Sequence, residues 1–207
     1  MQIKDFNTLP IGRYQEILKI SRNQSLEEID KQIKIVALLN DLSEREVLDL
    51  PIGDYSKLAE QTAFLAVAPE TRKKIADEIK VGDWDLIPVK DIRKMTTAQY
   101  IDFQTFSKDL EGYLVEMLSC LLVPKGHKYL QDYDVASLQE DLRRDLPVTD
   151  AVSMYAFFLS SCRDSMSSFR ISLMQMLKET TDPQERKMIQ ENLRILNSSL
   201  SGDGSQM

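Results

Sequence analysis

Apolar residues recur every three or four positions along most of the chain, the spacing that places them on one face of an α-helix. Over the first 69 residues this pattern predicts four helices, at residues 8–20, 25–40, 43–50 and 54–68. Ser25 and Ser43 each stand three residues before a glutamate, the spacing of a capping box, and Asp54 can cap the fourth helix. Residues 1–69 are therefore predicted to form one helical unit.

A linker at residues 70–95 follows, in which apolar positions alternate with polar ones. Its apolar residues lie on both sides of a Gly-Asp turn at residues 82–83: Ile79, Val81, Trp84 and Leu86. This pattern predicts a small β-hairpin. Because a ribbon of two strands is marginally stable alone, we expect Trp84 to pack against a neighbouring helix.

The helical pattern restarts at Thr96, which has capping-box spacing to Gln99. Its helices are predicted at residues 96–106, 113–123 and 135–142, with a fourth that includes residues 157–159. Tyr100 corresponds to Tyr14 in this second pattern, and the Leu-Pro break at residues 146–147 corresponds to the one at residues 50–51. We predict that residues 96–162 are a diverged copy of the first unit, although a shared helical period produces part of this similarity.

Two further helices, predicted over residues 163–200, have no counterpart in the first unit, and residues 201–207 have the composition of a flexible tail. The sequence therefore predicts a mainly α protein. It consists of two diverged copies of a four-helix unit with a small β-hairpin between them and extra C-terminal helices.

Composition narrows the classes of partner. Apolar residues make up 43% of the chain, enough to bury a core and to exclude disorder for most of it. The net charge of -7 argues against binding of nucleic acid. No continuous apolar run is long enough for a secretory signal or a membrane span, so we expect a soluble cytoplasmic protein that binds no membrane.

Catalytic chemistry has little support in the sequence. The two cysteines, Cys120 and Cys162, lie in apolar helical patterns, which indicates buried reduced thiols. The single histidine, His127, lies in a polar loop, so a metal site or catalytic triad cannot be assembled from several histidines. A pairing of either cysteine with His127 remains as the alternative. We expect no enzyme activity, no catalytic residue, no metal and no cofactor.

Five methionines cluster in the C-terminal third, at positions 154, 166, 174, 176 and 188. Flexible thioethers suit surfaces that accommodate apolar partners, and they also fill irregular gaps in cores. Because the C-terminal helices lie outside the predicted repeat, we expect them to expose an apolar face to a partner helix. Self-association of the chain is the rival explanation. The candidate partner-binding residues are Met166, Phe169, Leu173, Met176 and Leu177.

The segments at residues 34–39, 42–51 and 54–58 resemble tail assembly chaperones of tailed bacteriophages. In that family a helix ending in a short apolar segment precedes a small capped helix and a helix that starts with Asp-Tyr. The hairpin leading into residues 96–102 is similar to small phage structural or assembly proteins. The duplication and the long C-terminal helices depart from a minimal chaperone of this kind.

This resemblance implies a non-enzymatic assembly protein that covers apolar helices of the tape-measure protein before tail-tube subunits polymerise around it. The chain would then act in the host cytoplasm. The alternative is a structural virion component, such as a head-tail connector or an internal virion protein, which would use the same apolar faces for permanent assembly.

Overall fold

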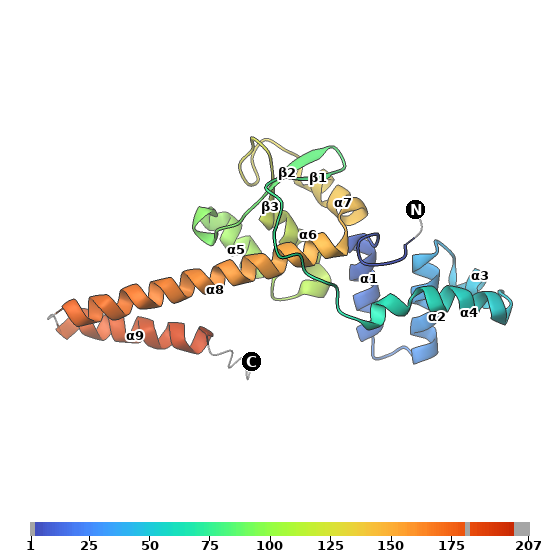
Figure 1. The fold of residues 1–207 in the computed structure, drawn as a ribbon, viewed down its shortest axis with the longest axis horizontal. Coiled ribbons are helices and arrows are strands. Elements are labelled where there is room, and N and C mark those ends of the chain that lie inside the picture. The colour runs from blue at the N-terminus through green and yellow to red at the C-terminus, as the bar shows by residue number, and fades with distance from the viewer. Residues whose placement is uncertain (1–2, 181–182, 201–207) are drawn as a thin grey trace. The chain divides into compact units, whose positions relative to one another are not determined.

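The computed structural model describes residues 3–180 and 183–200, and within these ranges it describes all side chains except those at 110–111, 164–170, 179, 185, 192 and 195–200. Its helices are α1 (Ile11–Arg22), α2 (Glu28–Leu39), α3 (Glu44–Leu48), α4 (Ile52–Gln61), α5 (Thr97–Phe106), α6 (Leu110–Leu121), α7 (Val135–Asp145), α8 (Val148–Glu179) and α9 (Pro183–Leu200) (Figure 1). Short 3-10 helices span Ala63–Ala66 and Ile92–Lys94. The strands are β1 (Ile79–Val81), β2 (Trp84–Pro88) and β3 (Leu122–Pro124). The predicted fold class, mainly α with a small hairpin, is confirmed.

Two of the predicted capping boxes are present. Ser43 Oγ accepts from the backbone N–H of Glu46 at the start of α3, and the Glu46 side chain accepts in return from the Ser43 backbone. Thr96 and Gln99 form the same reciprocal pair at the start of α5. Each box satisfies two backbone N–H groups that have no partner inside the helix.

The prediction that Ser25 and Asp54 cap helices was wrong. Ser25 lies too far before α2, which begins at Glu28, and its hydroxyl hydrogen-bonds to the Asn23 side chain at 2.6 Å instead. Asp54 lies inside the first turn of α4, because Pro51 occupies the N-cap position, and its carboxylate accepts from Lys57 Nζ at 2.8 Å.

The hairpin is part of a three-stranded antiparallel sheet with strand order β1-β2-β3. Ile79 lies opposite Leu86 on the hairpin, and Leu86 lies opposite Pro124 on β3. The sequence pattern assigned residues 122–123 to a helix, which was wrong. Helix α6 ends at Leu121 because Pro124 disfavours helical backbone at the β-branched Val123 before it.

Trp84 joins the sheet to helix α7, as predicted from the marginal stability of an isolated hairpin. Its indole Nε1 donates to Asp141 Oδ2 at 2.9 Å, and its ring packs edge-on to Tyr133 with centroids 6.2 Å apart. Gly82 in the hairpin turn has a φ of 55°, and a Cβ there would lie 3.1 Å from the Asp141 carboxyl carbon. Glycine is favoured at this position by both its backbone conformation and its close approach to α7.

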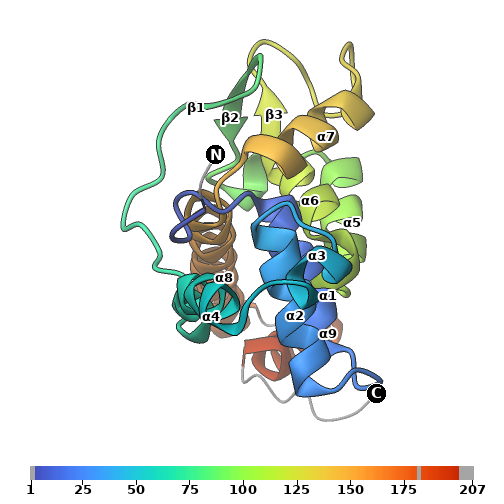
Figure 2. The same cartoon turned by 90° about the vertical axis from the view of Figure 1, so that its right-hand side faces the viewer.

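Helix α6 lies at the centre of the main core and packs against α1, α5, α7 and β3 (Figure 2). Val115, Met117, Leu118 and Cys120 on this helix are all completely buried. A second, smaller core joins α2, α3 and α4 around Val36, Ala37 and Val47. The helical periodicity of the sequence therefore produces two apolar clusters in this part of the chain.

The N-terminal segment is tied to the α7–α8 junction by backbone hydrogen bonds. Ile11 N donates to Leu146 O at 2.8 Å, and Val148 N donates to Leu9 O at 2.9 Å, on either side of a bridge between Pro10 and Pro147. Leu9, Ile11, Leu146 and Val148 are completely buried. The second Leu-Pro break is therefore a core contact as well as a helix boundary.

The chain divides into two compact units, residues 1–89 with 94–156 and residues 90–93 with 157–207. These bounds differ from the five predicted segments, because α8 continues without interruption past residue 162. Helices α1 to α3 and α5 to α7 each pack in chain order, as a repeat would. Consecutive helices commonly pack on one another in any case, so the duplication stays a prediction. The predicted tail at residues 201–207 lies outside the described residues.

Candidate interaction surface

The unit of residues 90–93 and 157–207 contains an antiparallel hairpin, formed by α9 and the part of α8 from residue 157 onward (Figure 1). We call residues 157–180 and 183–200 the C-terminal hairpin. Arg186 Nη1 on α9 donates to the carbonyl oxygens of Leu177 and Thr180 near the end of α8, each at 3.1 Å. Leu173 and Ile189, which are equally distant from residue 181 in sequence, are 5% and 2% exposed. These two residues mark the seam between the helices.

Three of the five candidate binding residues, Leu173, Met176 and Leu177, have described side chains on the side of α8 that faces this seam. At about 100° per residue, Met176 and Leu177 lie within roughly 60° of Leu173 around the helix axis. Leu173 is buried and Leu177 is half-buried, whereas Met176 is 47% exposed. The side chains of Met166 and Phe169 lie outside those that the structure describes. Leu173 is thus buried in the free chain, and its contact with a partner stays a prediction.

Other apolar side chains of the C-terminal hairpin are exposed. Ile171 is 66% exposed and Met174 is 46% exposed on α8, while Met188 is 61% exposed on α9. Ile171 and Met174 project about 160° and 100° away from Leu173, so α9 cannot cover them. We call Ile171, Met174, Met176 and Met188 the outer apolar residues. Ile171, Met174 and Met188 were not among the predicted binding residues, because the sequence does not show which sides of α8 and α9 face the seam.

The net charge is distributed unevenly between the two units. Residues 1–89 and 94–156 carry 18 basic and 26 acidic side chains, a net charge of -8. Residues 90–93 and 157–207 carry 8 basic and 7 acidic side chains, a net charge of +1. Electrostatic repulsion therefore opposes association least at the unit that exposes the outer apolar residues.

Cys120, one of the two thiols considered for chemistry, belongs to a buried hydrogen-bonded chain. Tyr129 OH donates to Asp102 Oδ2 at 2.9 Å, so its oxygen can accept the Cys120 S–H, which lies 3.3 Å away. Burial raises the pKa of the Cys120 thiol to about 11 and also raises the pKa of Tyr129. Both groups are protonated at neutral pH, and a protonated thiol is a poor nucleophile.

We expect Cys120 to make stability depend on pH in the alkaline range. Since folding raises the thiol pKa from its ordinary 9.0 to about 11, the stabilisation is complete below pH 9 and is lost as the pH rises to 11. The loss is on the order of 2 kcal/mol. Urea unfolding of the protein and of Cys120→Ala between pH 8 and 11 measures it. Parallel pH profiles for the two proteins would contradict this prediction.

His127 is exposed in its loop and packs edge-on to Tyr133, with ring centroids 5.8 Å apart. Burial raises the pKa of Cys162, the other thiol considered for a pairing with this histidine. Within residues 3–180 and 183–200, no group of three His, Cys, Asp or Glu side chains is placed to hold a metal ion. Among these same residues, no helix combines the length and the apolar character that a membrane span requires.

Comparisons of the chain with protein-family models, with curated proteins and with solved structures found no match. Its function is therefore inferred from the residues and the geometry described above.

Proposed function

We propose that this chain is a non-enzymatic assembly protein that binds an apolar helix of a partner through the outer apolar residues. The observation that supports this most strongly is the exposure of Ile171, Met174 and Met188 on a hairpin whose own seam is already filled by Leu173 and Ile189. Apolar side chains on helices present such faces to partner helices in groove-type recognition. Methionine suits this role because its flexible side chain adapts to imperfectly matched surfaces.

The partner proposed from the sequence resemblance is the tape-measure protein of a tailed bacteriophage. A long helical chain of that kind exposes apolar stripes until tube subunits cover it. The unit of residues 1–89 and 94–156 has a net charge of -8, which would keep the complex in solution. The C-terminal hairpin would meanwhile cover an apolar stripe of the partner. The chain would thus act as a tail assembly chaperone.

Co-expression of the chain with tape-measure fragments tests this proposal. We expect the chain to keep the fragments in the soluble fraction and to be absent from finished particles. If the chain remains in the particles in a fixed number of copies, the same contacts serve permanent assembly and it is a structural virion component. Fragments that precipitate equally with and without the chain, together with absence of the chain from finished particles, would contradict both forms of the proposal.

A further inference from the structure

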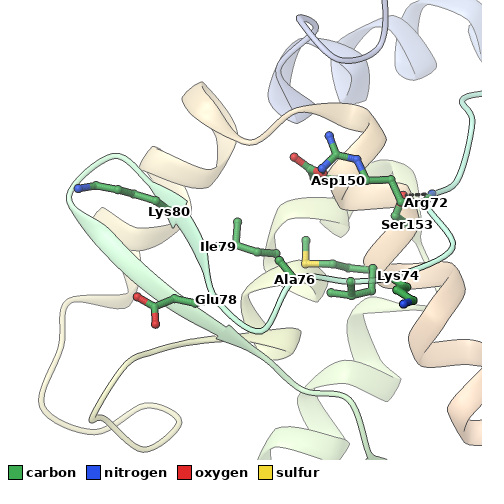
Figure 3. Close-up of a pocket in the computed structure, with 10 residues that line it drawn as sticks. Arg72, Lys74, Ala76, Glu78, Ile79, Lys80, Asp150 and Ser153 are labelled. Atoms are coloured by element: carbon green, nitrogen blue, oxygen red, sulfur yellow. Dashed lines mark hydrogen bonds and ion pairs between the residues drawn. The ribbon is translucent and has the colours of Figure 1, made fainter.

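Strand β1 is an edge of the sheet and lies beside a pocket. It pairs with β2 alone, so no strand in the described part of the chain pairs with its other side. An unpaired strand edge presents backbone N–H and C=O groups that can accept another strand. The pocket has a volume of about 270 Å³ and lies between residues 72–80 and the first turns of α8 (Figure 3).

The segment that leads into β1 is fixed to α8 at one end of this pocket. Arg72 N donates to Ser153 Oγ at 2.8 Å, and Ser153, which is 1% exposed, donates in turn to Thr149 O. The Arg72 guanidinium also pairs with Asp150 at 2.8 Å. Because these contacts are internal to the protein, the pocket is formed before any ligand binds. Figure 3 shows Arg72 and Asp150 at one end and Lys80 at the other.

The pocket combines an apolar wall with a net charge of +1, from Arg72, Lys74 and Lys80 against Glu78 and Asp150. Ile75, Ile79 and Met154 supply apolar side chains. Both acidic groups at the rim are already paired, Asp150 with Arg72 and Glu78 with Lys125 at 2.7 Å. Lys74 and Lys80 form no ion pair with any residue that the structure describes, and Asp85 forms none with Lys80 although it lies opposite on β2.

We infer that this pocket binds an extended acidic segment of another protein, which adds to the free edge of β1. Backbone hydrogen bonds to β1 would hold the segment, an apolar side chain would enter the pocket over Ile79 and Met154, and acidic side chains would face Lys74 and Lys80. In strand addition of this kind, backbone hydrogen bonds provide the affinity, and pockets for alternate side chains of the added strand provide the specificity. A local positive charge in a unit of net charge -8 favours an acidic partner. The residues involved differ from those of the C-terminal hairpin, so this inference does not depend on the proposed function.

A capped peptide of seven residues, with glutamate alternating with valine, is the probe for this inference. We expect it to shift the backbone amide resonances of residues 79–81 in the full-length protein and to bind at least tenfold more tightly than the same peptide with lysine in place of glutamate. The double variant Lys74→Glu/Lys80→Glu should reverse this preference. The single variant Lys74→Glu leaves Lys80 and Asp85 opposite each other. It should reduce the preference for the glutamate peptide without reversing it.

Lys73 and Lys108 provide the matched control, because both are exposed and neither lines the pocket. The variant Lys73→Glu/Lys108→Glu has the same net charge as the test variant and should retain the preference for the acidic peptide. The inference is overturned if millimolar peptide leaves residues 79–81 unshifted, or if the control loses the preference as fully as the test variant. In either case Lys80 would serve only as a charge that protects an exposed edge from aggregation.

Discussion

Replacing Ile171 and Met174 together with serine is expected to reduce capture of a tape-measure fragment at least tenfold. Both side chains are exposed in the free chain, at 66% and 46%, and would be buried against the partner helix. Losing two such contacts costs roughly 2 kcal/mol or more, which corresponds to more than a tenfold change in affinity. Titration calorimetry with a fragment of fixed length measures the effect.

Two variants on the same helix serve as comparisons. Ser172 is exposed and polar, so Ser172→Ala should leave both folding and capture unchanged. Leu173→Ser should lower the thermal stability of the C-terminal hairpin, because it places a hydroxyl in the seam beside α9. If Ile171→Ser/Met174→Ser stays folded and captures the fragment normally, the binding face lies elsewhere on the chain.

The largest loss of stability is expected from Leu118→Ala. Leu118 is completely buried on α6, the helix that packs against α1, α5 and α7. Truncating a leucine in such a site removes its apolar burial and leaves a cavity, which together cost about 2 to 5 kcal/mol. The midpoint of urea unfolding should fall accordingly.

Ile101→Ala is the matched control on the neighbouring helix α5. Ile101 is 56% exposed, so its truncation should change the free energy of unfolding by less than about 1 kcal/mol. If the two variants unfold at the same urea concentration, α6 is not the centre of the core.

Much of the helical architecture could be predicted from local sequence signals. The reciprocal side-chain pairs at Ser43 and Thr96 depend on residues three positions apart, so the sequence alone marks these helix starts. The hairpin could be found in the same way, from alternating apolar residues around Gly82. Ser25 also has the capping-box spacing, but α2 begins only at Glu28, so Ser25 does not cap it.

Features that depend on contacts between distant segments could not be predicted. Strand β3 exists because Val123 pairs with Ile87, which lies far away in sequence, and an apolar run of three residues gives no periodicity to reveal it. The backbone contacts of Leu9 and Ile11 with the α7–α8 junction are of the same kind.

The exposed face of α8 also could not be predicted from the sequence, because it depends on packing against another helix. The sequence placed Leu173 and Met176 on one apolar stripe of a helix, and helical geometry supports that grouping. Which side of the helix α9 would cover depends on how the two helices pack. Leu173 is therefore in the seam, while Ile171 on the opposite side is exposed.

Methionine methyl resonances provide the most direct test that the outer apolar residues bind the partner. The chain has nine methionines. Met174, Met176 and Met188 are exposed on the C-terminal hairpin, whereas Met117 and Met154 are buried in the unit of residues 1–89 and 94–156. On addition of a tape-measure fragment to protein labelled at the methionine methyl groups, we expect the resonances of Met174, Met176 and Met188 to shift or broaden and those of Met117 and Met154 to stay in place. Binding of the fragment with the three exposed methionines unchanged would contradict the account.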